Sequence, residues 1–146
     1  DMEDVNQIMD EVFIERMGGD QPHPARRAQL ALWLDGLQPL DRWVTLDSDP
    51  VKRGQSLFND PVVACASCHS GARYTNNKTV DVGTGLALQV PGLLGIGDRA
   101  PYMHDGCAPD LAARFVGNCG GGDAHGKTSH LSTAQIGDLV AYLETL

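Results

Sequence analysis

Two cysteines and a histidine at short, fixed spacing are the residues of this sequence best suited to chemistry. Cys65 and Cys68 are separated by two residues, and His69 follows directly. This spacing lets both thiols face the same way from one helical turn, so that each can add to one vinyl group of a single porphyrin. His69 would then bind the iron as the proximal axial ligand, oriented through its other ring nitrogen. The motif predicts one covalently bound haem c.

Two other interpretations of these cysteines lead to different chemistry. A Cys-x-x-Cys pair can be half of a zinc site, but structural zinc usually has a second, separated pair of ligands. A thioredoxin-like redox pair would follow a hydrophobic strand, and only residues 62–64 (Val-Val-Ala) could supply one. The adjacent histidine favours haem, because it is poorly placed to complete a zinc tetrahedron.

The remaining cysteines, Cys107 and Cys119, lie twelve positions apart in a glycine-rich region and could form a disulfide. The alternatives are two free thiols or, for Cys119, ligation of the iron. Covalent haem attachment in bacteria takes place outside the cytoplasm, where disulfides also persist. Both cysteine pairs therefore predict a periplasmic or exported protein.

Composition limits the partners of the chain. Its 146 residues suffice for one domain with an appendage, and its formal net charge is −8. This charge disfavours nucleic acid and anionic membrane and favours a redox partner with a basic docking surface, although solubility alone also accounts for it. No segment approaches the roughly 18 apolar residues of a membrane-spanning helix. Because the chain starts at Asp1 without a signal peptide, we expect a mature or excised fragment.

Hydrophobic periodicity predicts helices towards both ends of the chain. Apolar residues at helical spacing predict one helix from residue 5 to Gly18 and a second over 28–37, so that residues 1–50 form a helical hairpin or connector. Asp49 would cap the next helix, with Pro50 as its first residue. Within that helix, Gly54 leaves room for another helix to approach closely.

The second half of the chain is predicted to contain two helices after a long irregular segment. Residues 70–110 lack periodicity, which fits a loop wrapped around a flat apolar cofactor. A short helix is expected from Pro109 to Gly117, and a capping box at Ser132 starts a terminal helix that ends at Leu146.

Arginines in the irregular segment are candidates for binding the cofactor's carboxylates. Arg73 and Arg99 are plausible partners of the haem propionates, and each is equally well explained as a solvated surface arginine.

Several motifs together carry a resemblance to a known family. They are Arg-Gly-Gln-Ser-Leu-Phe at 53–58, the Cys-Ala-Ser-Cys-His motif at 65–69, Val-Gly-Thr-Gly at 82–85, Pro-Gly-Leu at 91–93, Arg-Ala-Pro-Tyr-Met-His-Asp-Gly at 99–106 and Asp-Leu-Val-Ala-Tyr-Leu at 138–143. With these motifs, residues 51–146 resemble a class I cytochrome c domain, and more narrowly the C-terminal haem domain of the bacterial di-haem cytochrome c peroxidase and MauG-like family. The resemblance implies an all-α cytochrome c fold, in which helices and long loops surround one covalent haem, preceded by the N-terminal hairpin.

The resemblance also bears on function. Members of the peroxidase group carry two haem motifs, and their peroxidase chemistry takes place in the other domain, whereas this chain has one motif. We therefore expect a mono-haem electron-transfer domain of a larger redox protein rather than a catalyst by itself. The alternative is a peroxidase-like or MauG-like haem enzyme, or its fragment, with an open sixth coordination site. A gas or redox sensor with an exchangeable ligand is a third possibility.

The sixth iron ligand departs from the family pattern. In the resembled domains it follows the short helix, at a position that falls near Asn118 here, and asparagine is a poor iron ligand. His125 lies in the same interval and is the predicted ligand, with Met103 as the alternative, since methionine is usual in cytochromes but here precedes the short helix. An open site and three further side chains stay possible: His104, Cys119 and His130. His/His ligation would give a lower potential than His/Met.

Overall fold

The computed structural model describes residues 5–37, 47–117 and 119–146. The chain divides into two compact units, Asp1–Pro39 and Leu40–Leu146. Their junction falls within residues 38–46, outside the described part of the chain. Within the described residues, no helix combines the length and the apolar character that crossing a bilayer requires.

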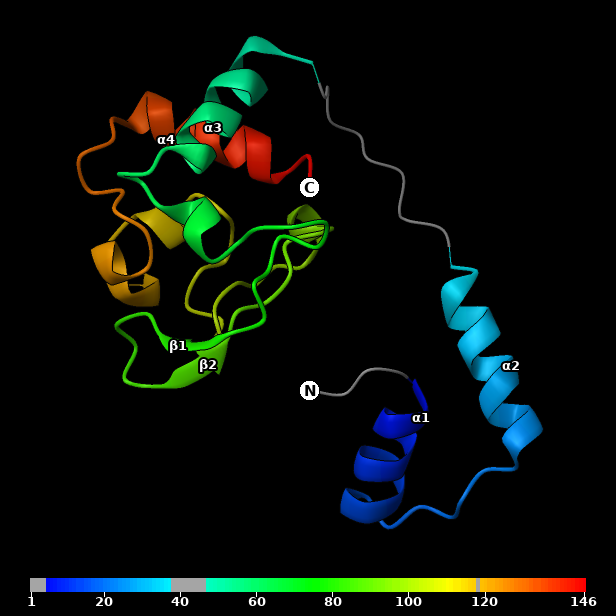
Figure 1. Ribbon diagram of the computed structural model, residues 1–146. Coiled ribbons are helices and arrows are strands. Elements are labelled where there is room, and N and C mark those ends of the chain that lie inside the picture. The colour runs from blue at the N-terminus through cyan, green and yellow to red at the C-terminus, as the bar shows by residue number, and fades with distance from the viewer. Residues whose placement is uncertain (1–4, 38–46, 118) are drawn as a thin grey trace. The chain divides into compact units, whose positions relative to one another are not determined.

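The N-terminal unit is a helical hairpin, as its periodicity predicts (Figure 1). Helix α1 (Val5–Ile8) continues as a π-helix over Met9–Arg16. The chain leaves this helix where Gly18 takes a φ of +67°, a conformation that glycine adopts without steric cost. Helix α2 (Pro24–Asp35) then begins with a proline in its first turn, where the missing N–H is no loss.

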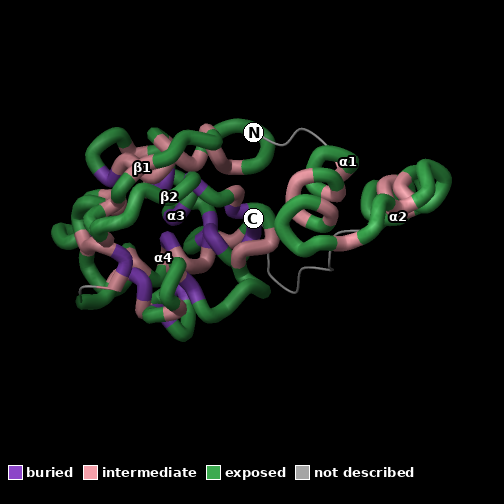
Figure 2. The backbone as a smooth tube through the Cα atoms, turned by 90° about the horizontal axis from the view of Figure 1, so that it is seen from below, coloured by how far each residue is buried: buried purple, intermediate pink, exposed green. Residues whose placement is uncertain are grey.

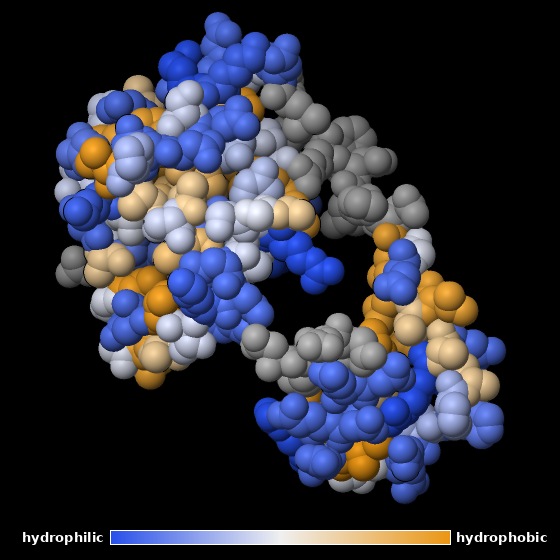
Figure 3. All heavy atoms as spheres, in the orientation of Figure 1, coloured by the Kyte–Doolittle hydropathy of each residue, from blue (hydrophilic) through white to orange (hydrophobic). Residues whose placement is uncertain are grey.

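This hairpin is held together by polar contacts and contains little core. An ion pair between Asp10 and Arg27 joins its two arms. Neither arm contains a buried residue, in contrast to α3 and α4 of the other unit (Figure 2). Apolar surface is visible along α2 in Figure 3. The exposed apolar side chains of this helix and the residues after it are Leu32, Trp33, Leu34 and Leu37.

Two crossed helices, α3 (Asp49–Asn59) and α4 (Thr133–Leu143), organise the C-terminal unit (Figure 1). They cross at Gly54, where an added Cβ would overlap the carbonyl oxygen of Asp138. The close approach predicted at Gly54 is thus confirmed. Helix α3 begins one residue earlier than predicted, because Ser48 and not Asp49 is the N-cap residue.

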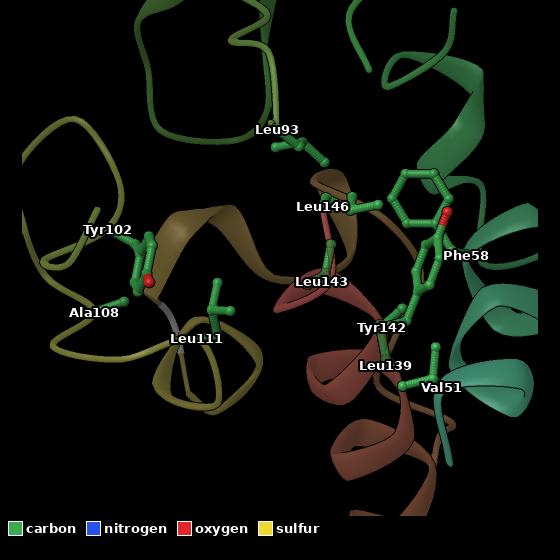
Figure 4. Packing of buried hydrophobic residues seen from close by; sticks show 10 residues of the cluster. All are labelled: Val51, Phe58, Leu93, Tyr102, Ala108, Leu111, Leu139, Tyr142, Leu143 and Leu146. Carbon is green, nitrogen blue, oxygen red and sulfur yellow. The ribbon is translucent and has the colours of Figure 1, made fainter. Parts of the chain in front are cut away.

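The core of this unit extends from the helix crossing to Tyr102, Ala108 and Leu111 of the connecting segments (Figure 4). The Phe58 ring of α3 packs edge-on against Tyr142 of α4, with centroids 5.3 Å apart. Burial of one such large side chain stabilises the fold by about 1.5–3 kcal/mol. The capping box predicted at Ser132 is present, with Gln135 as its second member, and the terminal helix ends at Leu143 rather than at Leu146. The buried cluster is formed by Val51, Phe58, Leu93, Tyr102, Ala108, Leu111, Leu139, Tyr142, Leu143 and Leu146.

Short elements connect the two crossed helices. Strands β1 (Thr79–Asp81) and β2 (Ala87–Gln89) pair antiparallel, and 3-10 turns occupy Cys65–Ser67, Ile96–Asp98, Ala113–Phe115 and Cys119–Ala124. The sequence did not predict the β1–β2 pair, because three-residue strands are too short for alternation to be recognised.

The helix predicted from Pro109 to Gly117 is wrong in its extent. Only Ala113–Phe115 is helical, as a single 3-10 turn. The side chain of Asp110 accepts the Ala113 N–H, and Gly117 leaves the turn with a φ of +72°. A segment this short gains too few hydrogen bonds to offset the cost of helix nucleation.

Candidate haem-binding site

The two cysteines of the motif lie on one tight turn. The N–H groups of Cys68 and His69 both donate to the carbonyl oxygen of Cys65, at 3.3 and 3.0 Å. Ala64 precedes this turn with a φ of +65°, and the neighbouring Val63 is only 1% exposed, which anchors the turn in the core. Neither Cys65 nor Cys68 takes part in a disulfide, so both thiols are available for another bond.

His69 is held in one tautomer by the backbone. Its Nδ1 lies 3.1 Å from the carbonyl oxygen of Tyr74. A carbonyl can only accept, so Nδ1 carries the proton and the lone pair of Nε2 is left for a metal. Burial lowers the pKa of His69, and the contact with Tyr74 partly opposes that shift. The imidazole is therefore neutral at pH 7, which is the form that binds iron.

His125 reaches the site from the glycine-rich loop after Cys119. Its N–H donates to Gly122 at 3.1 Å, and its carbonyl oxygen accepts a hydrogen bond from the guanidinium of Arg114. Burial, reinforced by the charges of Arg114 and His69, lowers the pKa of His125 to about 4. Its Nδ1 is buried and has no hydrogen-bond partner within the described residues. This imidazole is thus neutral and has an unsatisfied ring nitrogen.

The separation of the two imidazoles suits one metal ion between them. Their ring centroids are 6.2 Å apart and their planes are inclined by 36°. A metal–nitrogen bond of about 2.0 Å, followed by about 1.2 Å from nitrogen to ring centre, puts two histidines on one iron with centroids about 6.4 Å apart. The observed separation of His69 and His125 agrees with this value, so the residues present fit a haem iron.

Of the other candidates for the sixth ligand, Met103 lies against the start of the His125 loop. Met103 is half-buried and packs on Gly120, where an added Cβ would lie 2.9 Å from its sulfur. His104 and His130 are exposed. Asn118, the position expected from the family pattern, lies outside the described residues.

Cys107 and Cys119 are joined by a disulfide in the structure, with Cα atoms 5.8 Å apart. The bond ties the start of the His125 loop to the segment that follows Met103.

Within the described residues, no group of three or more His, Cys, Asp or Glu side chains could hold a metal ion.

The two arginines predicted to bind propionates each make a hydrogen bond with residues 92–93. Arg99 donates to the carbonyl oxygen of Gly92 at 2.7 Å, and the carbonyl oxygen of Arg73 accepts the Leu93 N–H at 3.2 Å. Both arginines are exposed. Their assignment to propionates stays a prediction.

One charged residue of the site, Arg114, is not predicted by the sequence pattern. Arg114 is 8% exposed, and its guanidinium lies 5.3 Å from the ring centroid of Phe115. Burial raises the pKa of the Cys65 thiol, and the nearby positive charge of Arg114 opposes this shift. Nothing in the local sequence distinguishes this arginine from a surface residue.

A Cys-x-x-Cys-His turn whose thiols are in no disulfide, with a second neutral imidazole 6.2 Å from the His69 ring, fits a haem-binding redox domain. Residues 51–146 match the family model described as cytochrome c, and the chain belongs to this family. Membership implies haem c as the cofactor and confirms the predicted fold class.

Among its relatives, the chain is similar to MauG and to a hydrazine synthase subunit. It is 30% identical to methylamine utilization protein MauG of Methylorubrum extorquens, over 92% of this chain and 48% of that protein. It is 29% identical to hydrazine synthase subunit gamma of Kuenenia stuttgartiensis, over 65% of this chain and 40% of the subunit. A solved chain of that organism's hydrazine synthase superposes with a TM-score of 0.72 and 26% identity, over 96% of this chain and 60% of the other. The chain thus spans about half the length of such relatives.

Proposed function

We propose that this chain transfers electrons as a mono-haem c-type cytochrome domain. Cys65 and Cys68 attach the haem, and His69 and His125 are its axial ligands. The observation that carries the proposal is the 6.2 Å separation of the two imidazoles. When bound, the haem supplies an iron that cycles between the ferrous and ferric states. Ligands on both faces leave no free position for a substrate, which favours electron transfer over catalysis.

The residues around the ligands have separate roles in this proposal. The Tyr74 carbonyl orients His69 and fixes its tautomer. Arg73 and Arg99 pair with the haem propionates, and the Cys107–Cys119 disulfide tethers the loop that holds His125. Both the thioether bonds and the disulfide fit a periplasmic or exported protein.

The chain is proposed to be part of a larger redox protein. Residues 1–50 serve as a connector and residues 51–146 as the haem domain. Support comes from the hairpin, whose two helical arms contain no buried residue and whose apolar side chains are exposed, as at Leu32, which is 73% exposed. Such side chains are suited to packing against a partner domain or subunit. The net charge of −8 favours a redox partner with a basic docking surface.

A second candidate function is a MauG-like or peroxidase-like haem enzyme with an open sixth site. It is favoured by the similarity to MauG and to a subunit of hydrazine synthase. Five-coordinate ferric iron that reacts with peroxide would support this candidate, whereas six-coordinate low-spin iron that is inert to peroxide would support electron transfer.

Two substitutions in the haem-loaded protein test the ligand assignment. His125→Ala should abolish the low-spin ferric spectrum, because the iron loses its sixth ligand. Met103→Ala is the matched control and should keep that spectrum, because the proposal gives its sulfur no bond to iron. Loss of the low-spin signal only in the methionine variant would contradict the assignment.

Covalent attachment is tested separately. Acid denaturation and extraction with organic solvent should leave the colour on the polypeptide, because thioether bonds to Cys65 and Cys68 survive this treatment. Colour in the solvent phase would refute attachment.

A further inference from the structure

Arg114 is a buried cation in the haem site that the proposed electron transfer leaves without a role. Only 8% of this residue is exposed, and it forms no ion pair with a carboxylate within the described residues. Burial of a charge without a counter-charge costs several kcal/mol. A function is therefore expected for this arginine.

Two contacts connect Arg114 to the distal loop. Its guanidinium donates to the backbone carbonyl oxygen of His125. Its Cδ also lies 3.0 Å from the position that a Cβ on Gly120 would occupy, so that its aliphatic part lies against the start of the same loop. The guanidinium also lies over the ring of the neighbouring Phe115. Arg114 thus fastens the loop at both ends of the segment that presents the distal histidine.

A role in binding a propionate fits less well. In haem, the two propionates lie on the edge opposite the two carbons that form the thioether bonds. Arg114 donates to the carbonyl oxygen of His125, and a Cβ added on the next residue, Gly126, would lie 3.8 Å from the Cys65 sulfur. The backbone that Arg114 binds is therefore near the thioether edge and beside the proposed distal ligand.

We propose that Arg114 is a positioning residue that holds the distal His125 on the iron and keeps a positive charge beside the haem. This inference rests on the proposed function, because it takes His125 as the sixth ligand. A positive charge in a site of low dielectric constant favours the ferrous over the ferric state and so raises the potential. The hydrogen bond to the carbonyl oxygen slows dissociation of the imidazole from the iron.

Two variants separate the charge from the hydrogen bond. Arg114→Met removes both. Arg114→Lys keeps the charge but shortens the side chain and replaces the planar guanidinium, with its several N–H donors, by an ammonium group. In the haem-loaded full chain, the potential is measured by redox titration, and the release of His125 is measured as the rate of carbon monoxide binding to ferrous iron. Lys127→Met is the matched control, since it removes an exposed positive charge from the same loop.

The expected results differ between the variants. Arg114→Met should raise the ferric-to-ferrous ratio at a fixed potential about tenfold, equivalent to 59 mV for one electron. It should also bind carbon monoxide about tenfold faster. Arg114→Lys should keep the wild-type potential but still bind carbon monoxide faster, and Lys127→Met should change neither quantity.

Failure of this inference can be told apart from failure of the proposed function. If His125→Ala loses the low-spin signal while both Arg114 variants keep the wild-type potential and carbon monoxide rate, the role of Arg114 is refuted and the ligand assignment stands. A low-spin signal that survives His125→Ala refutes both. If Arg114→Met does not fold, the carbon monoxide rate of Arg114→Lys decides, and an unchanged rate refutes the positioning role.

Discussion

Replacing Gly54 by alanine perturbs the crossing of helices α3 and α4. The new Cβ would overlap the carbonyl oxygen of Asp138, lie 2.6 Å from its carbonyl carbon and lie 2.8 Å from the Cβ of Tyr142. Backbone atoms in the middle of a helix cannot rotate aside as the end of a long side chain can. Helices α3 and α4 must therefore separate, and the contacts between Phe58 and Tyr142 must loosen.

The size of the effect follows from two opposing terms. Overpacking of a dense core costs about 1–3 kcal/mol, and a clash with backbone belongs at the upper end of this range. Alanine recovers about 1 kcal/mol because it is a better helix former than glycine. The net loss of unfolding free energy at Gly54 is about 2 kcal/mol, or roughly 10 °C in melting temperature.

Urea unfolding of the haem-loaded protein, followed by helical circular dichroism and by haem absorbance, measures this loss. Gly137→Ala is the matched control, because it makes the same change in α4, at a position where an added Cβ meets nothing within 4 Å. That variant should be stabilised by up to about 1 kcal/mol. If Gly54→Ala is as stable as the wild type, or if both variants are destabilised equally, the reasoning is refuted.

Three further predictions concern stability. Replacing both Cys107 and Cys119 by serine should lower the unfolding free energy by about 3 kcal/mol. The wild type should show no titratable thiol from this pair under denaturing, non-reducing conditions, and two such thiols would exclude the disulfide. Hydrogen bonds from Arg53 hold the pKa of Asp138 below its usual value. Their contribution to the free energy of unfolding is therefore complete above about pH 4 and is lost as the pH falls through the lowered pKa. Asp138→Asn should therefore flatten the loss of stability between about pH 5 and pH 2, and an unchanged acid profile of the unfolding midpoint would contradict this. Ser132→Ala should cost about 1 kcal/mol in urea unfolding through loss of the capping box, and an unchanged midpoint would show that the cap is dispensable.

Much of the fold could be predicted because its signals are local. The stripe that contains Val51 and Phe58 defines α3, the capping box at Ser132 defines the start of α4, and the glycine at 54 marks their crossing. Each signal depends on residues within one or two helical turns. The same local reasoning overextended the helix after Pro109, where a single 3-10 turn forms.

The site was less accessible to prediction because its contacts are long-range. The order of residues along the chain was enough to propose His125 as the partner of His69, and their separation of 6.2 Å supports this proposal. No pattern pointed to the Tyr74 carbonyl, whose position depends on a backbone φ of +52° at a non-glycine residue. Arg114 was missed because only the folded chain brings it to the carbonyl oxygen of His125.

The central claim is that one haem iron lies between His69 and His125. The most direct measurement is the combined optical and electron paramagnetic resonance spectrum of the ferric wild-type protein. We predict a low-spin signal from two nitrogen ligands, without the red absorption band that a methionine–iron bond gives. A high-spin, five-coordinate spectrum, or a low-spin spectrum with the methionine band, would contradict the account.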